Sequence, residues 1–326
     1  MATSSNSSSN SSPLSSPLSS PPDDLAQPFS FDARYGAGRR RTISLGGGGL
    51  YFVAWQIAYL NGLAARGVRL TDAEIVVGTS AGSLVAGILT AGRLHRFGVK
   101  VDLLAKLPAL VSALAPVKDL HPSQVRARDL FAEATDATPD TIRPIGHAAL
   151  AAQATPAAQL ARSTALVMGL RAWRSPALQI TTVDAYTGER LVLHGGHDLT
   201  VPQAAAASAS VPGLFSPQPI GDRRCMDGGV SGSGTHTDRL AGAERALVVS
   251  LVGGETTHPA GMTMSKDRQF EEIEQLRATG TEVHLTGPSG VDVERLMDPS
   301  AIGEALERGA HQAEVDAPAL LDFWAE

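Results

Sequence analysis

Apolar and polar residues follow two different periods in the part of the chain after residue 40. Residues 42–45 and 74–77 are short runs rich in β-branched side chains, each followed by glycine, which is typical of buried strands. Residues 50–65 are apolar nearly all round, which predicts a helix that is buried on most faces, and residues 81–91 predict a second helix. This strand–helix–strand–helix order with short connections predicts a parallel sheet.

The pattern changes over residues 98–174, which are rich in alanine and leucine and contain six prolines. We expect several helices and no strand there. The alternating residues 178–186 and the returning run 190–194 flank Thr187-Gly188 and predict a hairpin. Further helices are expected over residues 201–210, 264–279 and 300–324, and further strands over residues 224–226, 246–252 and 282–285. We therefore expect one α/β domain over residues 40–326 with a helical insertion at about residues 98–174.

The first thirty residues have a different composition. Residues 1–22 contain eleven serines, four prolines and no basic residue. Such a segment cannot bury enough apolar surface to offset its ordering entropy, so we expect a disordered tail over residues 1–30. The same stretch lacks the basic and apolar regions of a secretory leader, and we expect no signal peptide.

Two charge-free stretches, residues 42–65 and 75–92, exceed the length of ~18 residues that suggests a membrane span. The first stretch contains four successive glycines, and the second contains Gly78, Gly82 and two serines. Glycine runs are poor helix interiors, so the sequence favours buried elements of a soluble protein over membrane insertion. We expect no transmembrane segment.

Charge and cysteine content limit the class of protein. Lys and Arg total 27 against 33 Asp and Glu, a net charge of −6, which gives no argument for nucleic-acid binding. The single Cys225 excludes an intrachain disulfide. A cytoplasmic protein, peripheral at membranes if it acts on lipid, is the simplest interpretation, and secretion stays open. The sequence carries no indication of the oligomeric state.

Ser80 stands between Gly78 and Gly82 in a G-x-S-x-G pattern, after an expected strand and before an expected helix. A nucleophilic serine needs such a sharp turn to expose its oxygen at the sheet edge, and flanking glycines allow the turn without Cβ clashes. The N-terminus of the following helix directs free N–H groups toward the same place. This context favours a nucleophile at Ser80 over an ordinary strand-to-helix turn.

Residues 46–49 are four glycines between the first expected strand and the first expected helix. A dinucleotide-binding G-x-G-x-x-G pattern fails at its last glycine, and no Gly-Lys-Ser/Thr follows as in a Walker loop. Consecutive glycines also expose backbone N–H groups that stabilise the oxyanion of a tetrahedral intermediate. The nearby Ser80 favours this oxyanion role over nucleotide-phosphate binding or a structural turn.

A nucleophilic serine also needs a base. Asp227 follows a short expected strand and precedes Gly228 and Gly229, so its carboxylate is expected at the same edge of a parallel sheet as Ser80. An ordinary Asp-Gly-Gly turn is the other interpretation of this segment. A Ser-His-Asp triad is a further alternative, for which His236 is best placed because it follows Asp227 closely. The other histidines considered are His194, His197, His258 and His284.

Four segments in this order resemble the patatin-like phospholipase family. They are the glycine run, the serine pentapeptide, the small-residue segment 207–217, which has a structural role beside the site in that family, and the Asp-Gly-Gly turn. The resemblance covers the chain from about Thr42 to Val252, with a weaker echo in residues 296–299. It implies a three-layer α/β/α sandwich with a mainly parallel sheet, and hydrolysis of lipid acyl esters by a Ser-Asp dyad.

The resemblance also implies a role for each matching residue. Ser80 resembles the nucleophile and Asp227 resembles the base, which lowers the weight of a triad. Gly47, Gly48 and Gly49 resemble the oxyanion-hole glycines. The remaining motif positions are Gly78, Gly82, Gly228 and Gly229.

One position departs from the family pattern, which usually reads Gly-Gly-Gly-x-Arg/Lys-Gly. Tyr51 stands in place of the basic residue and Phe52 stands in place of the last glycine. Losing one contact to the developing negative charge lowers a rate by ~10²-fold. Either the backbone N–H groups suffice, or the Tyr51 hydroxyl donates in place of the cation. The bulk of Tyr51 and Phe52 also makes them candidate substrate-pocket residues that narrow the space for the acyl chain.

We expect a serine acyl-ester hydrolase that acts on lipid esters at a membrane or micelle surface. This chemistry needs no metal or organic cofactor, and the chain has no Cys/His or acidic cluster with metal-ligand spacing. The insertion at residues 98–174 is either an apolar lid or acyl channel, or a plain helical cap. The alternatives are a catalytically weak or inactive lipid-binding member of the same fold, and a transacylase that shares the acyl-enzyme.

Overall fold

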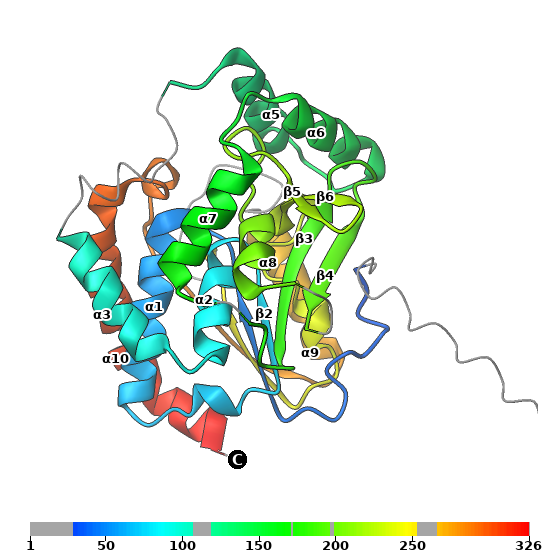
Figure 1. Ribbon diagram of the computed structural model, residues 1–326. Coiled ribbons are helices and arrows are strands. Elements are labelled where there is room, and N and C mark those ends of the chain that lie inside the picture. The colour runs from blue at the N-terminus through cyan, green and yellow to red at the C-terminus, as the bar shows by residue number, and fades with distance from the viewer. Residues whose placement is uncertain (1–28, 107–118, 171, 196–198, 253–265, 326) are drawn as a thin grey trace, which may run out of the picture.

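The computed structural model describes residues 29–106, 119–170, 172–195, 199–252 and 266–325 (Figure 1). The tail expected over residues 1–30 lies outside this part of the chain, apart from its last two residues. The described residues form one eight-stranded sheet in the order β5-β6-β3-β2-β1-β7-β8, with β4 also paired to β3. The strands are β1 (Arg41–Leu45), β2 (Ile75–Gly78), β3 (Leu178–Asp184), β4 (Arg190–His194), β5 (Gln218–Ile220), β6 (Arg223–Asp227), β7 (Arg245–Val249) and β8 (Glu282–Thr286).

The sheet has a parallel part and an antiparallel part. Strands β8, β7, β1, β2 and β3 are parallel to one another, as the strand–helix–strand order predicts. Strands β4 and β6 both run antiparallel to β3, and β5 runs antiparallel to β6. The expected α/β fold with a mainly parallel sheet is therefore confirmed, and the antiparallel strands gather at one side of it.

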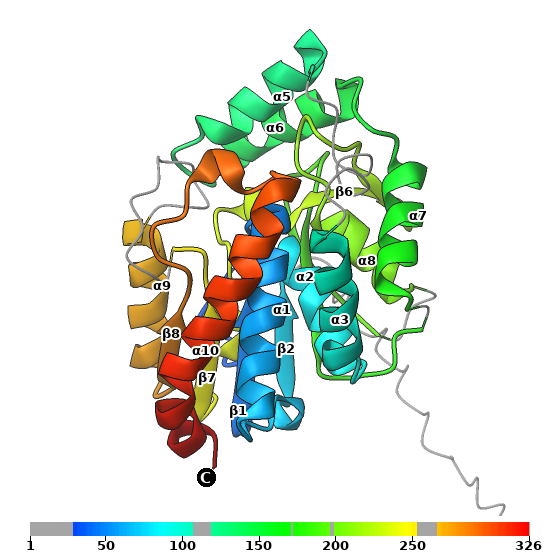
Figure 2. The ribbon, with the colours of Figure 1, turned by 90° about the vertical axis from the view of Figure 1, so that its left-hand side faces the viewer.

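Helices cover both faces of the sheet (Figures 1 and 2). The α-helices are α1 (Gly49–Ala65), α2 (Ala81–Thr90), α3 (Leu94–Ala105), α5 (Pro122–Ala132), α6 (Pro139–Ala151), α7 (Ala157–Met168), α8 (Val201–Ser208), α9 (Lys266–Ala278) and α10 (Ile302–Ala325). Short 3₁₀ helices span Leu70–Asp72, Gly228–Ser231, Thr237–Leu240, Val293–Arg295 and Pro299–Ala301. Helices α1, α2 and α10 lie on one face of the sheet and α9 lies on the other, which gives the three expected layers.

Strand alternation distributes the core between these layers. On β2, Val76 belongs to the large apolar cluster under α1 and α2, whereas Ile75 and Val77 belong to a smaller cluster under α9. On β7, Leu247 and Ala246 are divided in the same way. Successive side chains of a strand point to opposite faces, so strands apolar at every position are those buried between two helical layers.

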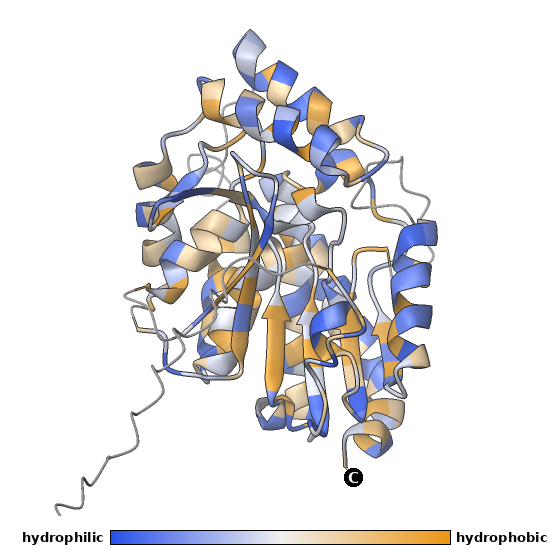
Figure 3. Ribbon diagram, turned by 90° about the vertical axis from the view of Figure 1, so that its right-hand side faces the viewer, coloured by the Kyte–Doolittle hydropathy of each residue, from blue (hydrophilic) through white to orange (hydrophobic). Residues whose placement is uncertain are grey.

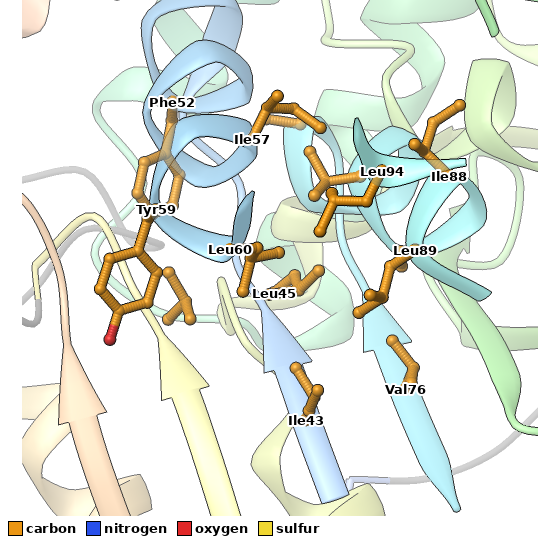
Figure 4. Packing of buried hydrophobic residues seen from close by; sticks show 14 of the residues in the cluster. Ile43, Leu45, Phe52, Ile57, Tyr59, Leu60, Val76, Ile88, Leu89 and Leu94 are labelled. Atoms are coloured by element: carbon orange, nitrogen blue, oxygen red, sulfur yellow. The ribbon is translucent and has the colours of Figure 1, made fainter. Parts of the chain in front are cut away.

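Helix α1 is central to the larger cluster, as its nearly uniform apolar sequence predicts. Its side chains pack down onto β1 and β2 together with those of α2 (Figure 4). On its other side α1 meets α10, where a Cβ atom on Gly309 would lie 2.3 Å from the carbonyl oxygen of Trp55. Glycine at this position therefore allows the two helices to pack backbone to backbone, and α1 is enclosed on most of its surface.

The two charge-free stretches of the sequence form β1 with α1 and β2 with α2. Strands β1, β2 and β7 are buried at nearly every position and lie inside the molecule, between the helical layers (Figure 3). Within the described part of the chain, no helix has the length and apolar character required to cross a membrane.

The described residues of segment 98–174 form most of α3 and all of α5, α6 and α7, and no strand. Helices α5 and α6 lie beside one another at the end of the molecule to which the parallel strands point (Figure 1). Helices α3 and α7 extend along the side of the sandwich next to α1 and α2. The segment therefore surrounds the carboxyl ends of β1 and β2, which is where the candidate chemistry lies.

Candidate active site

Two strands meet end to end along one edge of β3, and this junction carries the candidate residues. Strand β2 pairs with the first part of β3, with Gly78 opposite Ile180, and β6 pairs with the last part, with Asp227 opposite Thr182. Strand β4 pairs with the middle of β3 and so occupies its other edge. Strands β2 and β6 therefore run toward each other, and Ser80, two residues beyond Gly78, comes level with Asp227.

This arrangement corrects one expectation. Asp227 was expected at the end of a strand parallel to the one before Ser80, because the ends of parallel strands share an edge. Strand β6 is antiparallel to β3 and approaches the site from the opposite direction. Ser80 and Asp227 nevertheless face the same cavity, because β6 ends where the chain leaves β2.

Ser80 lies on a sharp turn between β2 and α2. Its backbone has φ 51° and ψ −117°, a conformation that residues other than glycine rarely adopt and that costs on the order of 1–3 kcal/mol. The Ser80 N–H donates to Oγ of Ser208 (2.8 Å), and the Ser80 carbonyl accepts from the Ser83 hydroxyl. The side chain of Ser80 is half-buried and borders the cavity. The turn therefore holds the hydroxyl at the cavity wall.

The glycines around Ser80 are required by close backbone contacts. A Cβ atom on Gly82 would lie 1.9 Å from the carbonyl oxygen of Leu45, and one on Gly78 would lie 2.7 Å from the carbonyl oxygen of Gly82. Real Cβ atoms do not approach backbone so closely, since interiors are close-packed. Gly82 thus brings α2 against the end of β1, and Gly78 brings α2 against the end of β2.

Asp227 is buried at the end of β6. Its Oδ1 accepts the N–H of Gly229 (2.8 Å), and its own N–H donates to the carbonyl oxygen of Ser210 (3.0 Å). A Cβ atom on Gly228 would lie 2.6 Å from the carbonyl oxygen of Thr181, so glycine is needed for the Asp227 turn to pack on β3. Among the described residues, no donor forms a regular hydrogen bond with the buried Oδ2.

Burial raises the pKa of Asp227 to about 6, although the Ser80 hydroxyl and the Gly229 N–H both act to lower it. The Ser80 hydroxyl is therefore within interaction range of the carboxylate, in a contact looser than a regular hydrogen bond. A carboxylate oxygen without a donor is free to take up a proton. Asp227 thus combines a free oxygen, a raised pKa and a neighbouring hydroxyl.

The four glycines of residues 46–49 differ in whether their N–H groups are already hydrogen-bonded. Gly46 donates to the carbonyl oxygen of Val249 (2.8 Å) and Gly47 donates to that of Gly234 (3.3 Å). The N–H groups of Gly48 and Gly49 have no acceptor among the described residues, and both glycines border the cavity with Ser80. Gly47 was expected to contribute an oxyanion-binding N–H, but the structure leaves Gly48 and Gly49 as the free donors of the run.

Tyr51 and Phe52 do not border the cavity, which corrects their assignment as substrate-pocket residues. Both lie on α1 and are buried. The Tyr51 hydroxyl accepts a hydrogen bond from Nη1 of Arg308 on α10 (3.3 Å). Phe52 packs on the glycine run, where a Cβ atom on Gly48 would lie 2.7 Å from the Cβ of Phe52. Helical rotation of 100° per residue directs the neighbouring Leu50 and Val53 into the cavity instead.

The described histidines do not border the cavity either. The ring of His236 is fully buried, with Nε2 at 3.2 Å from the carbonyl oxygen of Gly228 and Nδ1 at 3.2 Å from Nη1 of Arg190. His194 lies against the carbonyl oxygen of Gly195, and His284 lies near Asp316. His197 and His258 fall outside the described residues. No described histidine is thus in position to act on Ser80.

The cavity has a volume of about 460 Å³. Ser80, Asp227, Gly48 and Gly49 lie at its polar part, and the rest of its wall is largely apolar. The apolar wall is formed mainly by Leu50 and Val53 of α1, Leu84 of α2, Val101 and Leu104 of α3, Leu160 and Val167 of α7, and Val293, Leu296, Met297 and Ile302 before and at the start of α10. A cavity of this size and character accommodates an extended apolar group next to a few polar atoms.

Several residues of the site carry no signal of their own in the sequence. Ser208, which accepts the Ser80 N–H, lies within the small-residue segment 207–217, whose composition indicates only close packing. The cavity residues of α3 and α7 have the same helical spacing as ordinary core residues, so no local signal separates them. Within the described residues, no group of three or more His, Cys, Asp or Glu side chains could hold a metal ion.

Comparison with solved structures finds two bacterial proteins that match this chain at low sequence identity. The crystal structure of VipD from Legionella pneumophila is 14% identical, with 88% of this chain and 67% of that chain covered at a TM-score of 0.37. ExoU, in its complex with SpcU from the type III secretion system of Pseudomonas aeruginosa, is 19% identical, with 88% of this chain and 59% of that chain covered at a TM-score of 0.34. A second structure of the effector ExoU is 16% identical, with 86% of this chain and 53% of that chain covered at a TM-score of 0.31. The chain thus spans about half to two thirds of the length of these proteins.

No curated protein sequence matches the chain. A family model described as patatin-like phospholipase matches residues 43–237, which is more than half of the chain. The match includes the glycine run, the serine turn and the Asp-Gly-Gly turn, the same segments on which the resemblance was based. The chain therefore belongs to the patatin-like phospholipase family.

Proposed function

We propose that the protein is a serine acyl-ester hydrolase that acts on lipid esters, with Ser80 as nucleophile and Asp227 as general base. The observation that carries this proposal is the meeting of the Ser80 hydroxyl and the buried Asp227 carboxylate at one end of a largely apolar cavity. The apolar wall suits the acyl chain of a lipid ester, and the polar end suits its carbonyl group. Membership of the patatin-like phospholipase family supports the same chemistry.

The reaction begins with a proton transfer. Oδ2 of Asp227 takes the proton of Ser80 as Oγ attacks the acyl carbonyl carbon, and the carbonyl oxygen becomes an anion. The free N–H groups of Gly48 and Gly49 stabilise this oxyanion, together with the N–H of Ala81, which also lacks an acceptor among the described residues. Backbone donors thus take the place of the basic residue that is typical of the family at position 51.

The second half of the reaction reverses these roles. Asp227 returns the proton to the oxygen of the leaving alcohol as the tetrahedral intermediate collapses, and the acyl group stays on Ser80 as an ester. A water molecule then attacks the acyl-enzyme, Asp227 takes its proton, and the fatty acid leaves. An alcohol in place of that water would give transacylation, so the acceptor distinguishes the two activities.

Labelling with a fluorophosphonate probe tests the nucleophile directly. We expect the wild-type protein to be labelled and the Ser80→Ala variant to be unlabelled, because the probe reacts only with an activated serine. The Ser163→Ala variant is the matched control, since Ser163 borders the same cavity without a role in the reaction, and it should be labelled as the wild type is. Equal labelling of wild type and Ser80→Ala contradicts the proposal. A protein that retains bound lipid but is never labelled is a binder instead.

A further inference from the structure

Two helices of the cavity wall carry apolar side chains on their outer as well as their inner side. Val101 of α3 borders the cavity, whereas Val99 and Leu103 on adjacent turns are 61% and 59% exposed. Val167 of α7 borders the cavity, whereas the preceding Leu166 is 74% exposed. The packing of the core does not require these three outer side chains, because they are mostly in solvent.

Helices α3 and α7 lie side by side (Figure 2). Nζ of Lys100 donates to the carbonyl oxygens of Leu166 (3.1 Å) and Val167 (2.7 Å), and Nη1 of Arg93 donates to the carbonyl oxygen of Gly169 (2.7 Å). The exposed apolar side chains of the two helices therefore belong to one side of the molecule, directly outside the apolar cavity.

Basic residues accompany each of these side chains. Residues 93–106 and 157–168 together contain five Lys and Arg and a single acidic residue, in a chain of net charge −6. One helical turn separates Arg96 from Val99, Lys106 from Leu103, and Arg162 from Leu166, so each pair shares a helix face. We call these six residues the α3–α7 face. Lys106 also pairs with Asp102, the acidic residue of α3, at 2.9 Å.

We propose that the α3–α7 face docks on the surface of an anionic phospholipid bilayer. Its apolar side chains enter the boundary between head groups and acyl chains, while the long basic side chains reach the lipid phosphates. Basic side chains beside apolar ones on one face of a helix are typical of helices that lie in the interface of an anionic bilayer. The inference rests on the proposed function for its purpose, since it places the bilayer next to the acyl-chain cavity.

Sedimentation with vesicles tests docking without any need for turnover. The full chain carrying Ser80→Ala is mixed with vesicles of phosphatidylcholine alone, or of phosphatidylcholine with phosphatidylglycerol. We expect much stronger binding to the mixed vesicles, falling as salt is added. Leu103→Glu and Leu166→Glu should each weaken binding about tenfold, because an inserted leucine is replaced by an anion.

Val315→Glu is the matched control. Val315 on α10 is 60% exposed, nearly the same as Leu103, but its sequence neighbours are Glu314 and Asp316. Val315 does not belong to the α3–α7 face, so the control should bind vesicles as the parent protein does. Circular dichroism melts of the three glutamate variants, matching that of the parent protein, exclude unfolding as the reason for lost binding.

Three results overturn the docking proposal. They are no binding of the parent protein to mixed vesicles, undiminished binding of the Leu103→Glu/Leu166→Glu double variant, and equal loss of binding with Val315→Glu. Light scattering tests the alternative that the face binds a second copy of the chain. That alternative holds if the parent protein is a dimer that does not bind vesicles and Leu103→Glu converts it to a monomer. Hydrolysis of a soluble short-chain p-nitrophenyl ester by protein with intact Ser80 is measured separately. Its absence contradicts the proposed function and leaves the vesicle result unaffected.

Discussion

His236 lies with Nε2 at 3.2 Å from the carbonyl oxygen of Gly228, the residue that follows Asp227. A carbonyl only accepts, so Nε2 carries the ring proton and Nδ1 accepts from the Arg190 guanidinium. Burial and the neighbouring Arg190 lower the pKa of His236, so the ring stays neutral. Arg190 is itself held by Asp238 through hydrogen bonds of 2.7 and 2.8 Å. This buried chain of contacts ends on the backbone that holds the Asp227 carboxylate.

We therefore expect His236 to act as a positioning residue. His236→Ala removes one of two side-chain donors to the Gly228 carbonyl and leaves the Ser231 hydroxyl (2.9 Å) as the other, which costs about 1 kcal/mol of unfolding free energy and loosens the Asp227 turn. The Gly229 N–H then lowers the pKa of Asp227 less, so the midpoint of the pH–rate profile should move upward. His236→Gln, which keeps a side-chain N–H donor, should recover part of the shift. If His236→Ala is destabilised but the midpoint of its pH–rate profile is unchanged, the contact between His236 and Gly228 has only a structural role.

Hydrolysis should require the ionised form of Asp227. Because burial raises the pKa of this carboxyl to about 6, kcat/KM should be low in acid and rise to a plateau with a midpoint near pH 6. Asp227→Asn removes the base and should lower the plateau rate by about 10³-fold. The measurement is a pH–rate profile on a soluble ester. A rate independent of pH between 4 and 8 in the wild type argues against Asp227 as base.

The same pKa makes a prediction about stability. The folded protein keeps a proton on Asp227 up to about pH 6, whereas the unfolded chain releases it near the ordinary value of 3.8. The contribution of this group to stability is thus fully present below pH 3.8 and is lost as the pH rises through 6. At pH 7.5 Asp227→Asn should be more stable than the wild type by roughly 2 kcal/mol, and below pH 4 the difference should vanish. Urea unfolding at the two pH values measures it.

Gly49 should tolerate no side chain. Its φ is +67°, and a Cβ atom there would lie 2.6 Å from the carbonyl oxygen of Leu296. Gly49→Ala should shift the glycine run, lower kcat by about 10²-fold and destabilise the fold by about 2 kcal/mol. Gly38→Ala is the control, because Gly38 has φ +75° but no atom within 4 Å of the added Cβ. It should cost about 1 kcal/mol and leave kcat unchanged.

Tyr51 should contribute little to the rate. Its hydroxyl contacts Arg308, outside the cavity, so Tyr51→Phe should change kcat by less than about twofold. Tyr51→Arg restores the basic residue typical of the family, but it would bury a second cation next to Arg308 and should lower the melting temperature. A large loss of kcat in Tyr51→Phe, with KM and melting temperature unchanged, would assign the oxyanion contact to the tyrosine after all.

The sequence predicts the central part of the fold because each element there carries its own signal. The runs at β1 and β2 are β-branched and end at glycine, and α1 is apolar over almost its whole length, so both strands and both following helices are observed within one or two residues of their expected bounds. The serine turn is equally local. Gly82 is fixed by contact with the end of β1, which lies next to β2 in the sheet, and Gly78 is fixed by contact with the first turn of α2.

The antiparallel direction of β6 is hard to predict, because its partner β5 has almost no strand signal in the sequence. Strand β5 is three residues long and contains Pro219, so it has almost no strand periodicity. The Gly221-Asp222 pair between β5 and β6 is a two-residue hairpin signal that could have revealed the antiparallel pairing. The position of Tyr51 could not be predicted from its neighbours in sequence. It depends on Arg308 in α10, more than 250 residues away.

The strand that precedes the proposed nucleophile is held more firmly in the sheet than the strand that carries the proposed base. Strand β2 lies in the middle of the sheet between β1 and β3, whereas β6 is attached to β3 by three paired residues and bordered by the short β5. Warming that frays β5 and β6 would separate Asp227 from the Ser80 hydroxyl while the central strands of the sheet stay paired. Heat inactivation of this protein would then precede loss of its secondary structure, and cooling would restore turnover without a complete refolding of the chain.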